Sequence, residues 1–175
     1  IAATEALNCD RSSVWIYNSE KTAIVCLNLF ENSKNAHASG VELFAKDFPA
    51  YFKYLQEERS LAAHNAHTDP STCEFSVVYL TPLGINSMLD APFRLEGSMV
   101  GVICNEHVGP QREWTLEEQN FAGSLADLIS RAMQAEKRQV AQNELKRINE
   151  NLENIVEERT RALQKANGEL SEAMD

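Results

Sequence analysis

The sequence has few of the residues that interrupt helices, since it contains five prolines and seven glycines, and no proline follows Pro110. From Leu116 to Asp175 only Gly123 and Gly168 interrupt a composition rich in Glu, Ala, Leu, Gln and Arg, which favour helix formation. We predict one continuous helix here, about 90 Å long at a rise of 1.5 Å per residue. Such a helix extends well beyond a domain of this size, and a second chain would have to cover its apolar side chains.

Long apolar runs and an excess of positive charge are also missing. No apolar run approaches the ~20 residues of a transmembrane helix, and 16 Lys and Arg stand against 26 Asp and Glu, a net charge of −10. No basic patch for nucleic acid or for an anionic membrane is therefore expected. Cys9, Cys26, Cys73 and Cys104 form no C-x-x-C pair, which is typical of reduced, mostly buried thiols. We expect a fragment of a cytoplasmic protein.

Motifs of catalysis are lacking as well. The chain has no G-x-S-x-G, no H-E-x-x-H and no phosphate-binding glycine loop, and no nucleophile stands beside an obvious base. We therefore expect that this chain is not an enzyme.

Alternating residues predict an antiparallel sheet. Residues 11–18 (RSSVWIYN) alternate as a strand does, and residues 22–30 (TAIVCLNLF) supply its partner. Residues 86–95 and 98–107 are two further strands joined by Glu96-Gly97, a two-residue hairpin signal. The other predictions are short extended segments at 41–44 and 60–63 and loops at 32–40 and 64–69.

Helices are expected to flank these strands. Thr115-Leu-Glu-Glu118 is a capping box that starts the terminal helix, and Asp69-Pro70 combines an N-cap with proline at the first helical position. Hairpins dominate and no β-helix-β crossover repeats, so the predicted fold class is α+β. The expected helices are at 2–7, at 47–58 after a cap by Asp47, at 70–79, and from Leu116 onward.

Two segments resemble a known sensor module. Residues Gly101 to Leu128 (GVICNEHVGPQREWTLEEQNFAGSLADL) are similar to the last strand, the Trp-containing connection and the exit helix of GAF domains in bacterial signalling kinases. Residues Tyr79 to Val102 are similar to the helix end, strand and hairpin of the same domains. The resemblance covers about residues 3–135 and implies a GAF-like, PAS-related antiparallel sheet, so we expect a GAF sensor domain over 1–135.

The segment 136–175 resembles the signalling helix that precedes histidine-kinase or diguanylate-cyclase modules, through its V-x-E-R-T-x-x-L-x-x-x-N-x-x-L pattern. Its apolar residues also repeat in sevens, which independently predicts a parallel coiled coil and a homodimer. Asn149 and Arg159 fall inside the predicted seam, where polar residues lower stability but can fix register. The residues expected at the dimer interface are Leu145, Ile148, Leu152, Ile155, Val156, Leu163 and Leu170.

GAF domains commonly hold a small molecule between the sheet and the connections near the middle helices, and the resemblance implies such a pocket here. His107 is expected either to contact the backbone near Trp114 or to donate a hydrogen bond in the pocket. His64 and His67 could present two imidazoles to a metal, but they lie in a predicted loop without a third ligand, so no metal site is expected. The candidate pocket residues are Cys73, Tyr79, Asp90, Asn105 and His107.

The identity of a cofactor stays open. Phytochrome GAF domains carry a Cys-His pair shortly before a Tyr-Leu-x-x-Met-Gly-Val segment, and this chain has the similar Tyr79-Leu-Thr-Pro-Leu-Gly-Ile85. Phe75 and Ser76 stand where that pair would be, and Cys73 lies two residues early, about 200° away around a helix. A covalent bilin is therefore not expected. The chain also lacks the Asn-Lys…Phe-x-x-x-Asp-Glu set that cyclic-nucleotide-binding GAF domains often carry.

These features favour a sensory module whose state biases the packing of a paired exit helix. The resemblance implies a two-component sensor histidine kinase or, as an alternative, a diguanylate cyclase. A ligand-free structural dimerisation module fits the same residues. An enzyme of the methionine-sulfoxide-reductase type, which also uses a GAF-like fold, would need grouped cysteines that this sequence does not have.

Overall fold

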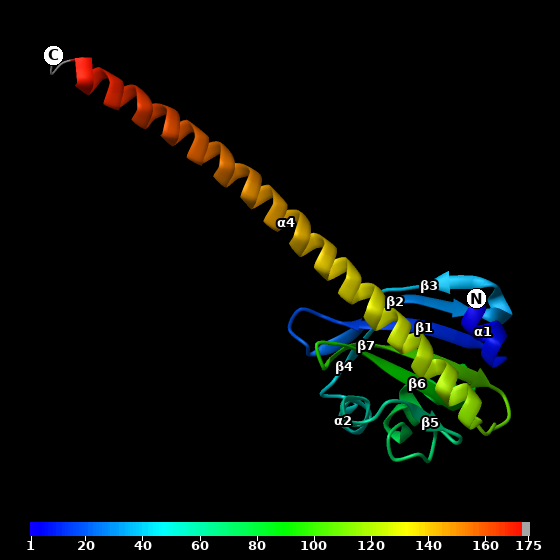
Figure 1. Cartoon of the computed structure of the whole chain (residues 1–175). Helices are drawn as coiled ribbons and strands as arrows, with labels where there is room; N and C mark the ends of the chain where they lie inside the picture. The colour runs from blue at the N-terminus through cyan, green and yellow to red at the C-terminus, as the bar shows by residue number, and fades with distance from the viewer. Residues whose placement is uncertain (173–175) are drawn as a thin grey trace. The chain divides into compact units, whose positions relative to one another are not determined.

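The computed structural model describes residues 1–172, and the burial of side chains through residue 166. A seven-stranded sheet lies at its centre, and every strand pairing in it is antiparallel. The strands are β1 (Arg11–Tyr17), β2 (Ala23–Glu31), β3 (Ala36–Ala38), β4 (Glu42–Phe44), β5 (Leu61–Ala63), β6 (Ile85–Leu95) and β7 (Ser98–Val108). They follow the order β3-β2-β1-β7-β6-β5, and β4 pairs with β2 (Figure 1).

Helices flank the sheet, as the predicted α+β fold class requires. The structure confirms that class, with its antiparallel sheet and long C-terminal helix. The helices are α1 (Ala2–Leu7), α2 (Pro49–Glu57), α3 (Thr81–Leu83) and α4 (Leu116–Glu172), and shorter turns are the 3-10 helices Asn32–Lys34 and Cys73–Phe75 and the π-helix Ser76–Leu80.

Two predicted local signals are confirmed by their geometry. Glu96 and Gly97 both have positive φ angles, 53° and 83°, as a two-residue hairpin turn requires, and they join β6 to β7. Glu118 accepts a hydrogen bond from the Thr115 amide at 2.8 Å, and Thr115 Oγ1 accepts one from the Glu118 amide at 3.2 Å. This reciprocal pair is the predicted capping box at the start of α4.

Two predictions of secondary structure are wrong. Residues 32–40 contain a 3-10 turn and β3, which pairs with β2, where a loop was expected. The helix predicted over 70–79 is instead a 3-10 turn and a π-helix that lead into α3, so the helical segment runs past Pro82 to Leu83. Pro82 has no amide hydrogen, so it cannot donate a backbone hydrogen bond within this segment. In the preceding turn, the Thr81 hydroxyl donates a hydrogen bond to the Ser76 carbonyl at 2.7 Å.

The cap of α2 also differs from the prediction. Phe48, and not Asp47, occupies the N-cap position, and its side chain makes no capping hydrogen bond. The carboxylate of Glu74 accepts hydrogen bonds from the amides of Ala50, at 3.1 and 3.2 Å, and Tyr51, at 3.3 Å. A residue 24 positions away therefore satisfies the orphan amides of this helix.

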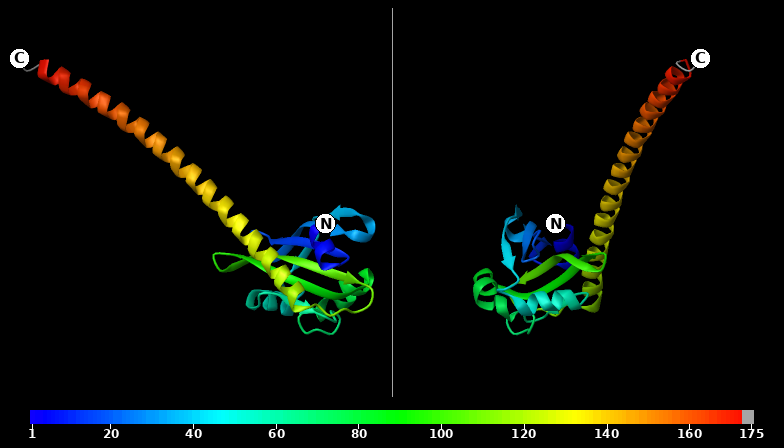
Figure 2. Two further views of the ribbon diagram at one scale, coloured as in Figure 1. Left: turned by 45° about the vertical axis from the view of Figure 1, so that its right-hand side comes forward. Right: turned by 90° about the vertical axis from the view of Figure 1, so that its left-hand side faces the viewer.

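The sheet separates two layers. Its inner face, which we define by Trp15, Ile24, Met88 and Val102, forms the main core with α2 and the segment around Phe75. Its outer face carries α1 and the first turns of α4, and the two layers can be followed in Figure 2. The buried side chains of α4 in this part are Ala122 and Ala126.

The chain forms two compact units, Ile1–Ala132 and Met133–Asp175, and α4 contributes to both. None of the helices described here is long and apolar enough to cross a membrane.

Candidate functional site

Four polar side chains lie together on the inner face of the sheet. Arg11 of β1 pairs with Glu106 of β7, and Cys104 of β7 pairs with Asp90 of β6. Cross-strand partners share a face, as do side chains two residues apart on one strand, so these four point toward the same layer. All four are buried, and Asp90 has no exposed surface. We call these four residues the acidic cluster.

Helix α2 contacts the acidic cluster through Tyr51. The Tyr51 hydroxyl donates a hydrogen bond to Asp90 Oδ2 at 2.6 Å and lies 3.5 Å from Cys104 Sγ. The pKa of Asp90 is raised from 3.8 to about 7, chiefly by burial. The hydrogen bond from Tyr51 lowers this pKa, and the negative charge of Glu106 contributes to the rise. Among the residues that the structure describes, none forms a hydrogen bond with the second carboxyl oxygen, Oδ1. Asp90 can therefore gain or lose a proton near neutral pH.

Glu106 is held differently, because a cation lies beside it. Its Oε2 is 3.3 Å from Arg11 Nε. Burial raises the pKa of Glu106, while the charge of Arg11 and the hydroxyl of Tyr79 lower it. The Arg11 guanidinium also lies 5.7 Å from the centre of the Tyr79 ring. The π-helix that carries Tyr79 is thus linked to β1 and β7 through one buried ion pair.

Aromatic side chains cover the acidic cluster. The Phe75 ring stacks on Phe48 with centroids 4.2 Å apart and meets Tyr51 edge-on at 4.8 Å. Phe75 is buried, so this residue fills space between the sheet and the middle helices. Burial also raises the pKa of the Cys104 thiol well above its usual value, so this group stays protonated. The arrangement can exchange a proton or hold a polar group, but it offers no thiolate nucleophile.

The structure brings together only two of the five candidate pocket residues. Tyr79 and Asp90 both contact the acidic cluster. Asn105 pairs with Ser12 and Leu89 on the neighbouring strands, so its side chain lies on the outer face. There its side-chain amide donates a hydrogen bond to the Leu89 carbonyl at 3.0 Å. Cys73 is exposed, which corrects the expectation of a mostly buried thiol there.

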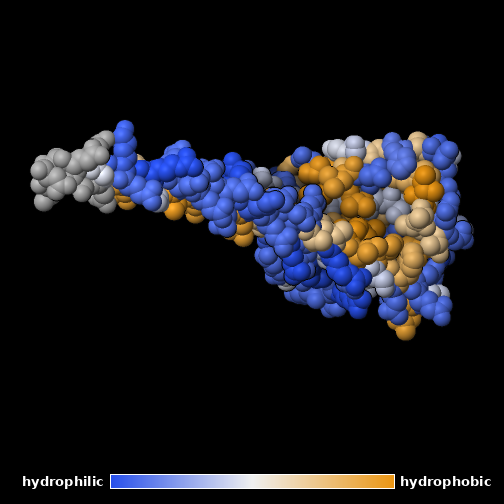
Figure 3. Space-filling model, turned by 45° about the horizontal axis from the view of Figure 1, so that its top comes forward, coloured by the Kyte–Doolittle hydropathy of each residue, from blue (hydrophilic) through white to orange (hydrophobic). Residues whose placement is uncertain are grey.

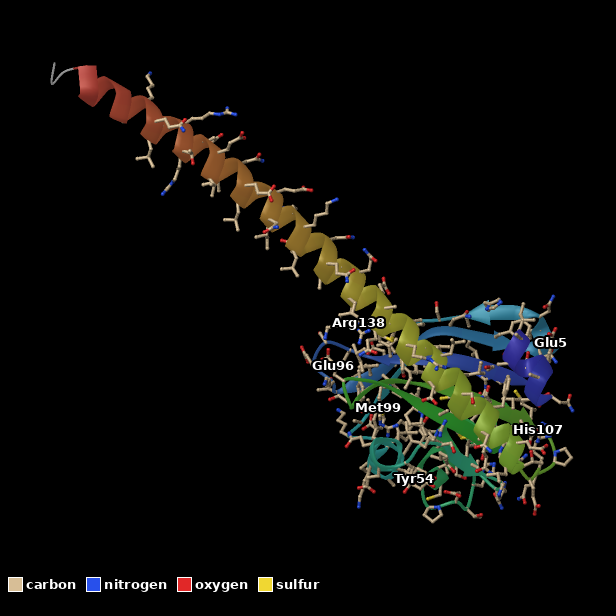
Figure 4. All side chains as sticks on the ribbon, viewed as in Figure 1. Glu5, Tyr54, Glu96, Met99, His107 and Arg138 are labelled. Atoms are coloured by element: carbon tan, nitrogen blue, oxygen red, sulfur yellow. The ribbon has the colours of Figure 1, made fainter. Side chains whose placement is uncertain are left out.

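The three histidines near this region have structural partners. His107 lies at the end of β7, far along the strand from Met99 (Figure 4), and its Nδ1 is 3.0 Å from Asp10 Oδ2. The contact expected between His107 and the backbone at Trp114 is made instead by His64, whose Nδ1 accepts from the Trp114 amide at 3.0 Å. His67 Nδ1 lies 2.8 Å from Ser76 Oγ. Among the described residues, no three His, Cys, Asp or Glu side chains are grouped as a metal ion requires.

Sequence reasoning missed Arg11, Tyr51, Cys104 and Glu106 as members of this site. One signal could have indicated two of them, because Cys104 and Glu106 flank the candidate Asn105 and must face the opposite side of a strand. Tyr51 was assigned to core packing, and it is buried there, but its hydroxyl also binds Asp90. Arg11 carried no sequence signal, since its role depends on the pairing of β1 with β7.

A second group of contacts joins the end of α2 to α4. The guanidinium of Arg94 donates to the carbonyls of Leu55, Gln56 and Glu58 at 2.8, 3.0 and 2.9 Å. The Arg94 amide donates to Ser130 Oγ of α4 at 3.1 Å. One residue of β6 therefore contacts both the helix that reaches Asp90 and the helix that leaves the sheet.

Arg59 reinforces this connection. Its guanidinium is 2.8 Å from Asp127 Oδ2, and it packs across Gly123 of α4. A Cβ atom at Gly123 would lie 3.1 Å from Arg59 Nε, so a larger residue would crowd this side chain. Glycine inside a helix costs about 1 kcal/mol relative to alanine, and here it makes room for the arginine.

The chain belongs to the GAF family, because the model of the GAF domain matches residues 2–133. A search of curated proteins finds no match.

Solved structures share the fold at low identity. The GAF domain of Thermosynechococcus elongatus PixJ, in its blue-light absorbing form, is 16% identical with a TM-score of 0.64, covering 81% of this chain and 85% of that one. A domain of a putative two-component sensor histidine kinase from Sinorhizobium meliloti is 16% identical with a TM-score of 0.56, covering 81% and 90%. The GAF domain of a phosphoenolpyruvate-protein phosphotransferase from Coxiella burnetii is 18% identical with a TM-score of 0.61, covering 79% of each.

Proposed function

We propose that this chain is a cytoplasmic sensory GAF module that passes a signal through a dimeric C-terminal helix to an output domain following it, without being an enzyme itself. The observation that supports this proposal is the unbroken helix α4, from Leu116 to Glu172. Its start is fixed by the Thr115 and Glu118 capping box and by contacts with β6. No break separates this anchored part from the part predicted to form the coiled coil.

The later part of α4 exposes a row of large apolar side chains. Their exposed fractions range from 41 to 67%, which is unfavourable for a single helix in water. Figure 3 shows hydrophobic atoms along one side of this helix. A second copy of the helix, parallel and in register, would cover them. The residues in this row are Leu145, Ile148, Leu152, Ile155, Val156 and Leu163, while the side chain of Leu170, also proposed for the interface, is outside the described part.

For the output domain we propose a histidine kinase of a two-component system, with a diguanylate cyclase as the alternative. The likeness to the domain of a putative two-component sensor histidine kinase from Sinorhizobium meliloti is consistent with the first. Sequencing the residues that follow Asp175 in the full-length protein would decide between them.

The transmission proposal is tested by shifting the phase of α4 in the full-length protein. One alanine inserted after Glu144 turns the following helix by about 100°, while seven restore the heptad phase. We expect the single insertion to change output activity sharply and the seven-residue insertion to preserve most of it. Equal activity of the two variants would show that the helix is only a tether.

A ligand-free dimerisation module is the second candidate. The observation that favours it is the packing of Phe75 against Phe48 and Tyr51, which fills the inner face above Asp90. Asp90 has no exposed surface, so a small-molecule ligand that contacts it would have to displace part of this packing. Native mass spectrometry of freshly purified protein separates the two candidates, because a sensor that retains its ligand shows an added mass and an empty module does not.

A further inference from the structure

Two buried carboxyl groups share one cation in the acidic cluster. Arg11 Nε lies 3.3 Å from Glu106 Oε2, whereas none of the ion pairs among the described residues involves Asp90. Asp90 has no exposed surface, so bulk water does not reach its carboxyl group. The charge of Glu106 therefore has a partner and that of Asp90 has none, which makes Asp90 the more readily protonated of the two.

The other titratable groups that face Asp90 stay neutral near pH 7. They come from α2, β7 and the π-helix, and they are the hydroxyls of Tyr51 and Tyr79 and the thiol of Cys104. Burial raises the pKa of each of them well above its usual value. Strand β5 beside β6 carries no titratable side chain, and Glu74, next to Phe75, binds the amides of α2. A change of pH around neutrality therefore changes the charge of this cluster chiefly at Asp90, whose pKa is about 7.

The contact between Asp90 and α2 differs between the two protonation states. With Asp90 ionised, the Tyr51 hydroxyl donates to Asp90 Oδ2 at 2.6 Å. With Asp90 protonated on Oδ2, the carboxyl group can donate to Tyr51, whose own hydrogen can then turn to Cys104 Sγ, 3.5 Å away. The ionised state also places charge on Oδ1, to which no described residue donates a hydrogen bond, and a buried charge without a donor is unfavourable. The protonated carboxyl group therefore favours the packed arrangement of α2, and the ionised group favours one in which water reaches Asp90.

Helix α2 is connected to the first turns of α4 at two points, although the two helices lie on opposite faces of the sheet (Figure 2). Arg94, four residues after Asp90 on β6, donates from its guanidinium to the last carbonyls of α2 and from its amide to Ser130. Arg59, just beyond the end of α2, lies 2.8 Å from Asp127. A shift of α2 therefore acts on α4 through both contacts.

We propose that this module responds to pH, and that loss of a proton from Asp90 moves α2 and, through Arg94 and Arg59, the first turns of α4. The inference rests on the proposed function, because α4 must pass the movement to an output domain, and it names the proton as the signal. With a pKa of about 7, Asp90 changes from about nine-tenths protonated at pH 6 to about one-tenth at pH 8. The ratio of the two states thus falls about a hundredfold across this range.

The test is a titration of the chain by nuclear magnetic resonance, with isotope labels in the aspartate carboxyl groups and in the backbone amides. We expect one carboxyl resonance to titrate with a midpoint near pH 7 and to be lost in Asp90→Asn. The amide resonances of α2 and of residues 116–132 should shift with the same midpoint, and Asp90→Asn should hold them at their low-pH positions. The exposed Asp47→Asn is the matched control and should titrate as the unmodified chain does.

A second variant at the same contact keeps the ring and changes only the hydroxyl. Tyr51→Phe removes a hydrogen bond that lowers the pKa of Asp90, so the midpoint should rise by about one pH unit or more. A midpoint that stays in place would contradict the contact between Tyr51 and the titrating group.

Further measurements separate sensing from transmission. Arg59→Gln together with Ser130→Ala removes both contacts with α4 and leaves the acidic cluster in place. In this double variant the α2 resonances should still follow pH, while those of residues 116–132 should not. In the full-length protein, output activity divided by that of Asp90→Asn at the same pH should change with a midpoint near pH 7, since the division removes the pH dependence of the output domain itself.

The outcomes distinguish this inference from the proposed function. If no carboxyl group titrates between pH 6 and pH 8, or if one does while the α2 and α4 resonances stay in place, the inference is wrong. Resonances of residues 116–132 that follow pH in the double variant would also contradict it. A constant activity ratio in a protein whose single-alanine insertion alters output would overturn the inference and leave transmission through α4 standing. A constant ratio together with equal activity of the two insertion variants would overturn both.

Discussion

Replacement of Asp90 by asparagine should remove a pH dependence from the stability of this domain. The pKa of Asp90 is raised from 3.8 to about 7 in the folded chain, so the folded state binds more protons than the unfolded state between about pH 4 and pH 7. The free energy of unfolding therefore falls as the pH rises through this window, by about 4 kcal/mol in total at 1.36 kcal/mol per pH unit. Between pH 5 and pH 8 the expected loss is about 3 kcal/mol.

Asparagine keeps the size of the side chain and an oxygen that can accept from Tyr51, but it does not ionise. The stability difference between Asp90→Asn and the unmodified chain should grow in favour of the variant by about 3 kcal/mol from pH 5 to pH 8. At a slope of 1–3 kcal/mol per M of urea, the midpoints should separate by roughly 1 M or more. Urea unfolding at several pH values measures this, with the exposed Asp47→Asn as the matched control. Parallel pH profiles for the Asp90 variant and the unmodified chain would refute the reasoning.

Other changes test separate parts of the molecule. Leu152→Asp together with Leu163→Asp should give a monomer in analytical ultracentrifugation, and a surviving dimer would place its interface upstream. Expression with bilin-synthesis enzymes should yield a colourless protein after denaturing electrophoresis, and a zinc-fluorescent band lost on Cys73→Ser would contradict this. Arg94→Ala should lower the free energy of unfolding by about 1–3 kcal/mol, because three carbonyls lose a charged donor. Glu74→Ala should cost about 1 kcal/mol through loss of the α2 cap, and a thermal midpoint equal to that of the unmodified chain would exclude such a role.

The strands and the terminal helix could be predicted because their signals are local. Alternation in residues 11–17, the Glu96-Gly97 turn and the Thr115 capping box each depend on residues close in sequence. The cap of α2 could not be predicted in the same way, because Glu74 reaches it across 24 positions. The π-helix at Ser76–Leu80 was missed for a related reason, since its side chains alone also fit an ordinary helix.

The candidate site was predicted only in part. Asp90 and Tyr79 were identified as polar residues in segments that border the expected pocket, and both lie at the acidic cluster. Asn105 was grouped with them although it faces the other side of the sheet. Successive side chains of a strand point to opposite faces of the sheet. Glu106 and Cys104 therefore lie on the same face as Asp90, whereas Asn105 between them lies on the other face. Arg11 joins them through strand pairing across more than 90 positions, which no local pattern indicates.

The contacts of Arg94 restrict where this domain can accept an insertion. One added residue in α2 would move its last carbonyls by 1.5 Å and turn them by about 100°, out of reach of a guanidinium that is fixed at β6. The Arg94 amide is held by Ser130 at the same time, so the strand cannot move to follow them. Changes in chain length among relatives of this protein should therefore fall in the connections before Phe48 and after Ala63, while the length of α2 stays constant.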